Sequence, residues 1–232
     1  MPEVAKAREG GKGHPAPQAI LFDLDGTLVD SVPDLACCID RMLLELGLSP
    51  AGEEKVRQWV GDGAERLVAR ALTGELEGEP DPELFRRAFD LFSRCYLEQT
   101  GNSRLYPGAR EALERLGEAG LRLGCVTNKR TRFTLPLLEA LGIDRHFDIV
   151  VCGDTLEEKK PHPAPLLHAV RNLESAPPAS LMVGDSANDI TAARAAGMPV
   201  AAVTYGYYRG GHVGEARPDH LLDNLLELCE LV

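Results

Sequence analysis

Two aspartates separated by one residue, Asp23 and Asp25, follow an apolar run and precede a Gly-Thr turn. Side chains alternate along an extended chain, so we expect both carboxylates on one side while Leu24 points into the core. Two carboxylates this close stay ionised at neutral pH only if a cation joins them; otherwise one of them keeps a proton. The pair therefore predicts a metal site or a shared proton.

Further polar side chains follow later apolar segments of the chain. Thr127 and Asn128 follow one segment, Lys160 a second and Asp185 a third. Ligands bind at the carboxyl ends of parallel strands, so we expect these groups to meet the aspartate pair. Asp185 adds an oxygen ligand of the kind that Mg2+ prefers. The other three offer hydrogen-bond donors and positive charge for phosphoryl oxygens.

Asp189 lies four residues after Asp185, close to the start of a predicted helix at 187–197. Negative charge is favourable at that end of a helix, and residues four apart share one face. Two roles are open for Asp189. It could contact the ion through water, or it could hold Lys160 in place.

The elements that would position these groups follow a clear order. Strand patterns lie at 18–25, 121–129, 147–154, 180–186 and 199–206, with helical patterns between the later ones and a closing helix at 221–232. Residues 33–102 show helical patterns only. This order predicts an α/β fold, a doubly wound parallel sheet with an inserted α-helical cap. The expected division is a mobile leader at 1–17, an α/β core at 18–32 and 104–232, and the cap at 33–103.

The overall charge limits the possible partners. The 232 residues include 25 Lys and Arg against 36 Asp and Glu, a formal net charge of -11. This field repels nucleic acid and anionic membranes, so we expect neither as a partner, and an anionic substrate needs local positive charge. No apolar run approaches the roughly 20 residues of a membrane span. We expect a cytoplasmic protein, a monomer or a homodimer.

Four motifs, in order, resemble those of the haloacid dehalogenase (HAD) superfamily of hydrolases: FDLDGT at 22–27, VTNK at 126–129, KKPHP at 159–163 and GDSANDI at 184–190. The insertion resembles the phosphoglycolate phosphatase branch of that superfamily, as do YPG at 106–108, CGDTLEEKKP at 152–161 and TYGY at 204–207. The resemblance implies a HAD-like Rossmannoid core and a Mg2+-dependent phosphatase.

The resemblance also implies roles for the acidic groups. Asp23 would attack phosphorus and form an aspartyl-phosphate, and Mg2+ would be held by Asp23, the Asp25 carbonyl and Asp185. Asp25 would protonate the leaving alkoxide and later take a proton from water. Dehalogenases of the superfamily do not need this acid, so an aspartate at position 25 favours chemistry on a phosphate ester or anhydride.

The remaining polar groups are implied to bind phosphate. Thr127, Asn128 and Lys160 would hold the transferring group, with Lys160 also pairing with Asp23. Asp189 is implied to support these groups without contacting the ion directly.

The insertion contains a turn, Gly61 to Gly63, that opens a helix. Free backbone N–H groups at a helix start can receive an anion, although an ordinary turn between two helices would look the same. By resemblance this turn is the specificity loop of a small cap. Gly61 and Gly63 would then bind the carboxylate of a small phosphorylated carboxylate substrate, assisted by Arg66.

The substrate implied is 2-phosphoglycolate, hydrolysed to glycolate and phosphate. A phosphatase of another small phosphorylated metabolite, such as a sugar phosphate or pyrophosphate, and a phosphoglucomutase share the active groups and stay open. A signalling receiver module also combines an acidic Mg2+ pocket with Thr and Lys, but its acidic pair and its phosphoacceptor lie on different strands. A binding protein with an inactive pocket is disfavoured because every reactive position is filled.

Overall fold

The computed structural model describes residues 16–98, 101–209 and 211–232, and is built on a six-stranded sheet of order β5-β4-β1-β6-β7-β8. Every neighbouring pair of these strands is parallel. The strands are β1 (Ala19–Phe22), β4 (Arg122–Val126), β5 (Ile149–Val151), β6 (Ser180–Gly184), β7 (Val200–Val203) and β8 (His220–Leu222). The strand order reverses at β1, which is where such sheets bind ligands. The parallel sheet predicted from the sequence is confirmed, and residues 1–15 of the predicted leader lie outside the described residues.

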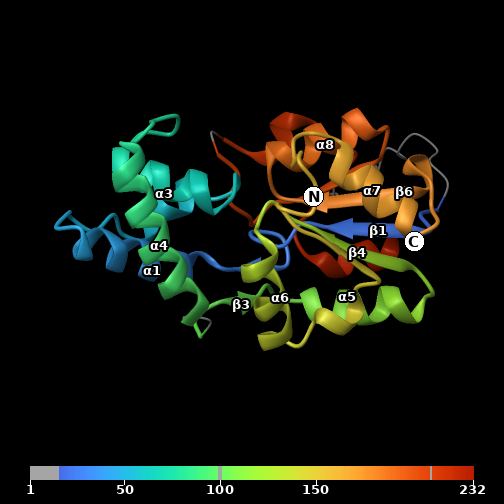
Figure 1. Cartoon of the computed structure of the whole chain (residues 1–232). Coiled ribbons are helices and arrows are strands. Elements are labelled where there is room, and N and C mark those ends of the chain that lie inside the picture. The colour runs from blue at the N-terminus through green and yellow to red at the C-terminus, as the bar shows by residue number, and fades with distance from the viewer. Residues whose placement is uncertain (1–15, 99–100, 210) are drawn as a thin grey trace, which may run out of the picture.

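Helices cover both faces of the sheet (Figure 1). They are α5 (Ala109–Glu118) and α6 (Thr131–Ala140) on one face, and α7 (Ala164–Asn172) and α8 (Ala187–Ala196) on the other. Strand β1 contributes to both layers, since Ile20 and Phe22 pack with α5 and α6 while Leu21 packs with α7 and α8. Because a strand between two helical layers has no face toward water, its sequence is apolar without alternation.

Four helices are inserted between Asp30 and Arg104 and form a separate cluster of buried side chains. They are α1 (Val32–Glu45), α2 (Glu53–Trp59), α3 (Ala64–Thr73) and α4 (Pro82–Glu98). The chain enters and leaves this insertion through an antiparallel pair, β2 (Val29–Asp30) and β3 (Arg104–Leu105). Figure 1 shows α1, α3 and α4 beyond one end of the sheet. The described part of the insertion contains no strand between α1 and α4, as its sequence pattern predicts.

The predicted closing helix at 221–232 is wrong. The structure has strand β8 and a 3-10 helix, Leu225–Glu230, in its place. Leu222 pairs with the edge of β7, and Leu225 and Leu228 are buried in the same core cluster. A spacing of three residues fits a 3-10 helix, in which side chains at i and i+3 overlie one another. The other short 3-10 helices are Asp144–His146, Pro177–Ala179 and Val213–Ala216.

Two smaller differences concern the third predicted strand. The pattern at 147–154 forms only the short strand β5, and Lys160 lies beyond it in the loop before α7 rather than at a strand end. Among the described residues, no helix is both long and apolar enough to cross a membrane.

Candidate active site

Lys160 lies at the centre of the polar groups that the sheet brings together. Its ammonium group is 2.8 Å from an oxygen of Asp23 and 2.6 Å from an oxygen of Asp189. It also donates a hydrogen bond of 2.7 Å to the carbonyl of Val126, the last residue of β4. The lysine is 3% exposed, so its three N–H donors have three oxygen partners in place of water.

Three carboxyl groups form an acidic cluster beside this lysine. Oxygens of Asp23, Asp185 and Asp189 lie within 4.8 Å of one another. Burial raises the pKa of Asp23 to about 7, against the lowering effect of Lys160. Burial and the neighbouring carboxylates also raise the pKa of Asp185 well above its usual range. Removal from water and mutual repulsion both disfavour the ionised forms, so this arrangement favours the binding of a cation.

Asp185 is held by both of its carboxylate oxygens. The hydroxyl of Thr27 donates to one at 3.2 Å, and the backbone N–H of Tyr207 donates to the other at 2.6 Å. Two glycines make room for it. A Cβ on Gly206 would lie 2.2 Å from the Cβ of Asp185, and one on Gly26 would lie 2.3 Å from its Oδ2. Only glycine fits at these two positions without displacing the carboxylate.

Asp189 connects a helix start to Lys160. The backbone N–H and the hydroxyl of Ser186 donate to its Oδ2 at 3.0 and 2.6 Å, forming a capping box at the start of α8. Its other oxygen accepts the hydrogen bond from Lys160. Both oxygens of this fully buried carboxylate are therefore occupied by protein donors.

Asp25 lines the same pocket as Asp23, as the sequence predicts, but the two carboxylates do not share a cation. Strand β1 ends at Phe22, so strict alternation no longer governs the next residues. The two oxygens of Asp25 each lie 2.9 Å from the ammonium of Lys129, and the Ser31 hydroxyl donates to one of them at 2.6 Å. The cation beside Asp25 is thus a lysine. The carboxylate of Asp25 lies outside the acidic cluster around Lys160.

Lys129 is one of the residues that the sequence reasoning missed. It belongs to the VTNK motif at 126–129, yet only Thr127 and Asn128 were assigned to the site. Its side chain is almost fully buried, 6% exposed, and its ammonium lies 4.8 Å from the centre of the Tyr96 ring on α4. A lysine immediately after a buried strand was the available signal, since lysines are rarely buried without a partner.

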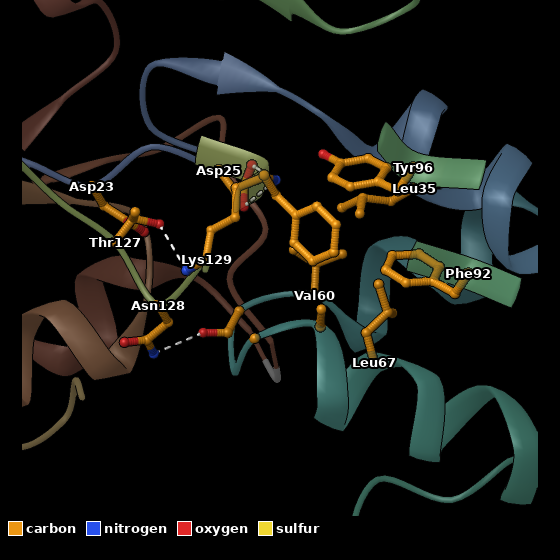
Figure 2. A pocket seen from close by; sticks show the side chains of 14 residues that line it. Asp23, Asp25, Leu35, Val60, Leu67, Phe92, Tyr96, Thr127, Asn128 and Lys129 are labelled. Carbon is orange, nitrogen blue, oxygen red and sulfur yellow. Dashed lines mark hydrogen bonds and ion pairs between the residues drawn. The ribbon is translucent and has the colours of Figure 1, made fainter. Parts of the chain in front are cut away.

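A pocket opens between the sheet end and the inserted helices. Figure 2 shows Asp23, Thr127 and Asn128 on the sheet side, facing Leu67 and Phe92 on the insertion. Aromatic and aliphatic side chains line the insertion side, and polar groups line the sheet side. Such a pocket excludes water above a charged centre.

The turn that was expected to contact substrate lies at the edge of this pocket. Gly61 and Gly63 both line it, with φ angles of 124° and 92° that favour glycine. The amide group of Asn128 donates to the carbonyl of Gly61 at 3.2 Å and to that of Lys160 at 2.9 Å. Asn128 therefore connects the insertion to the loop that contains Lys160.

Asp62, between the two glycines, joins three elements. Its carboxylate accepts hydrogen bonds from Arg209 at 2.6 Å and Asn188 at 2.7 Å, and it lies 2.7 Å from the guanidinium of Arg70 on α3. Burial raises the pKa of Asp62, but the hydrogen bonds from Arg209 and Asn188 outweigh it and hold that pKa at about 2. We call Asp62, Arg70, Asn188 and Arg209 the Asp62 cluster. Sequence reasoning did not anticipate it.

Arg66, expected to assist with the substrate carboxylate, points elsewhere. Its guanidinium group pairs with Glu77 and hydrogen bonds to the carbonyl of Gly78. It lines a second cavity, on the other side of α3, and it is not among the residues lining the active-site pocket. The expectation for Arg66 is wrong.

A family model described as haloacid dehalogenase-like hydrolase matches residues 20–203. The chain belongs to the haloacid dehalogenase-like hydrolase family. The matched region contains the acidic cluster, Lys160 and Lys129, so this family membership, predicted from the four motifs, is confirmed. Within the HAD family, the chain also has close relatives along almost its whole length.

The chain is 52% identical over 217 residues to a phosphoglycolate phosphatase of Nitrosococcus oceani, covering 93% of this chain and 96% of that protein. It is 50% identical over 217 residues to a phosphoglycolate phosphatase of Nitrosospira multiformis, covering 93% and 95%. Among solved structures, a predicted phosphoglycolate phosphatase from Haemophilus somnus 129pt has a TM-score of 0.88 at 39% identity, covering 94% of this chain and 99% of that one. The HAD fold therefore extends through the inserted helices.

Proposed function

We propose that this protein is a Mg2+-dependent phosphatase that hydrolyses 2-phosphoglycolate to glycolate and phosphate. The observation that carries the proposal is the position of Lys160, a buried ammonium group shared between Asp23 and Asp189 beside Asp185. Such a group of charges suits attack by a carboxylate on a phosphate ester, which is itself an anion. Relatives about half identical to this chain carry the name phosphoglycolate phosphatase, which supports the choice of substrate.

The acidic cluster fits a hard divalent ion such as Mg2+, which takes oxygen ligands and usually one or two carboxylates. Asp23, Asp185 and the carbonyl of Asp25 would hold it. Both oxygens of Asp189 already accept hydrogen bonds from Lys160 and Ser186, so Asp189 orients the lysine instead. When bound, the ion would neutralise charge on the phosphoryl oxygens and on the attacking carboxylate.

The first half of the reaction transfers the phosphoryl group to Asp23. A carboxylate oxygen of Asp23 attacks phosphorus, and the bond between phosphorus and the ester oxygen breaks. Asp25 supplies the proton that the departing glycolate oxygen needs. Lys160 and the hydroxyl of Thr127 offer donors to the phosphoryl oxygens during the transfer.

The second half releases phosphate and restores the protein. Water attacks the phosphorus of the aspartyl-phosphate while Asp25 takes its proton, and the carboxylate of Asp23 leaves. The side chains of Leu67 and Phe92 cover the pocket, so they restrict the entry of water to the reacting centre. Asp25 is kept in position by Lys129 and Ser31 throughout.

A panel of phosphorylated metabolites tests the proposal. We expect 2-phosphoglycolate to have a kcat/KM at least 100-fold above those of sugar phosphates and pyrophosphate, in line with sites that hydrogen bond to a polar group of the substrate. Activity should require added Mg2+ and should be lost in Asp23→Asn. A ranking with 2-phosphoglycolate far below a sugar phosphate would overturn the substrate. Conversion of glucose 1-phosphate to glucose 6-phosphate without phosphate release would instead indicate a phosphoglucomutase.

A further inference from the structure

Lys129 is a buried cation that takes no direct part in the bond-breaking steps proposed above. Among the described residues that line this pocket, it is the only one with a positively charged side chain; Arg209 lines the adjoining cavity, which also contains Asp23, Asp25 and Asp185. Figure 2 shows it between Asp25 on the sheet side and Tyr96 on the insertion side. The cation of this pocket therefore lies where the two halves of the protein meet.

The two buried lysines of the site differ in their free donor capacity. Lys160 contacts oxygens of Asp23, Asp189 and Val126, which matches its three N–H donors. Lys129 contacts the two oxygens of a single carboxylate, Asp25, and its other partner is the uncharged side chain of Tyr96. Replacing the neutral Tyr96 partner by a carboxylate would strengthen the interaction of this ammonium group, because hydrogen bonds between two charged groups are stronger than those to a neutral group.

We propose that Lys129 binds the carboxylate of the substrate and so determines the preference for a phosphorylated carboxylic acid. This inference rests on the proposed function. A phosphoryl group held by Lys160 and Thr127 leaves the remainder of a small substrate directed toward Lys129 and the apolar residues of the insertion. In a pocket lined by Leu67 and Phe92, an ammonium–carboxylate contact is weakly screened by water. A neutral substrate of the same size therefore gains much less binding energy from Lys129.

The competing explanation is that Lys129 only positions Asp25. The carboxylate would then be received by backbone N–H groups at the start of α3, next to Gly63. The two explanations differ in one measurable respect. Loss of a residue that positions Asp25 slows every substrate alike, because Asp25 acts on each of them. Loss of the carboxylate-binding cation slows only substrates that have a carboxylate.

The experiment compares 2-phosphoglycolate with 2-hydroxyethyl phosphate, which has a hydroxymethyl group in place of the carboxylate. We define the preference as the ratio of the two kcat/KM values, a quantity from which effects on Asp25 cancel. Lys129→Met should lower this preference about 10- to 100-fold, the range for one hydrogen bond to a charged group. Lys129→Arg, which keeps the charge, should retain more of the preference than Lys129→Met.

A matched control and a second neutral variant complete the design. Lys55→Met removes the same charge from an exposed lysine on α2, away from the residues that line the pocket, and it should leave the preference unchanged. Lys129→Gln keeps a donor for Asp25 without the charge, so it provides the same test if Lys129→Met fails to fold. Thermal unfolding of each variant identifies such a failure.

The outcomes separate the role of Lys129 from the proposed phosphatase activity. A preference that stays within threefold of wild type in both Lys129→Met and Lys129→Gln, while both substrates slow equally, would overturn the role of Lys129 and leave the phosphatase intact. A wild-type protein that does not hydrolyse 2-phosphoglycolate would overturn the proposed function itself.

Discussion

The ammonium group of Lys160 lies 2.8 Å from the carboxylate of Asp23, and the same group contacts Asp189 at 2.6 Å. One buried cation thus serves two buried carboxylates. In the Lys160→Met variant both would lack their partner, and breaking a buried ion pair in this way typically costs about 3–5 kcal/mol. We expect a loss of stability of this size at pH 8, and a fall in kcat of about 100- to 1000-fold, as for the loss of one transition-state donor.

Urea unfolding and initial rates of Lys160→Met check this prediction. The loss of stability should be smaller at pH 5.5 than at pH 8, because protonation relieves carboxyl groups that have lost their cation. Lys159→Met, one residue away but outside the acidic cluster, should unfold like wild type. Equal stability of the two variants at pH 8 would contradict the shared pairing.

Binding of Mg2+ should depend on pH. Burial raises the pKa of Asp23 to about 7 in the metal-free protein, whereas the ion needs the ionised carboxylate. Below pH 7 a proton competes with the ion, so apparent affinity should fall as the pH decreases. Calorimetric titration with Mg2+ at pH 6 and pH 8 should show tighter binding at pH 8, and proton release at pH 6. Affinity that is equal at both values would show that the two ligands do not compete at Asp23.

The same raised pKa predicts how the stability of the metal-free protein depends on pH. A carboxyl group whose folded pKa lies above its ordinary value of 3.8 favours unfolding as the pH rises from about 4 to 7, because the unfolded chain loses that proton first. Asp23→Asn removes this effect. We therefore expect the inactive variant to have a higher melting temperature than wild type at pH 8 without Mg2+, and a smaller response to added Mg2+.

The Asp62 cluster should hold the turn at the mouth of the pocket. Asp62→Asn keeps the shape of the side chain but removes the charge that faces Arg70 and Arg209. We expect kcat/KM to fall about 10-fold, mainly through KM, because the turn would no longer be fixed over the substrate. Asp90→Asn makes the same chemical change on the exposed side of α4 and should have no effect.

A double-mutant cycle tests the cluster directly. Asp62→Asn and Arg209→Met should be non-additive in the free energy of unfolding, with an interaction energy of about 0.5–3 kcal/mol for residues in contact. The difference in free energy of unfolding between wild type and Asp62→Asn should have its full value above pH 4. It should shrink as the pH falls toward 2, because the folded pKa of Asp62 is about 2 against an ordinary 3.8. Simple additivity would mean that the two side chains do not act together.

Gly206 is predicted to be difficult to replace because it lies next to the acidic cluster. In Gly206→Ala the new Cβ would lie 2.2 Å from the Cβ of Asp185, so the carboxylate must move. We expect Mg2+ affinity and activity to fall at least 10-fold, as for the loss of support to a metal ligand. Gly117→Ala, in α5 with no atom within 4 Å, should instead stabilise the protein by about 0.5–1 kcal/mol. Measuring Mg2+ dependence and melting temperature of both variants distinguishes the two effects.

Sequence patterns predicted the parts of the fold that depend on local order. The unbroken apolar run of β1 indicates burial on both faces, and the capping pair of Ser186 and Asp189 is visible as a spacing of three. The end of the chain was misjudged because leucines at 222, 225 and 228 fit both a helix and a strand followed by a 3-10 helix. Hydrogen bonding of β8 to β7 decided between them, and no local pattern encodes that pairing.

The site was predictable where one motif supplied one group, and unpredictable where groups from distant segments meet. Lys129 stands in a motif, but its partners Asp25 and Tyr96 are fixed by the packing of α4 against the sheet end. Asp62 and Arg209 are 147 residues apart, and neither has a chemical reason to be noticed without the other. A buried cation and its counterion often come from distant segments, so the sequence shows each residue but not which two will pair.

The pairing of β2 with β3 has a consequence for how such proteins diversify. Val29 faces Leu105 and Asp30 faces Arg104, so the inserted segment starts and finishes at adjacent points. Any replacement segment with similarly close ends could be accommodated there without shifting the register of the central sheet. Evolution can therefore exchange the part that covers the pocket while conserving the part that carries the acidic cluster, and a chimaera made at these two strands would keep the parallel sheet intact.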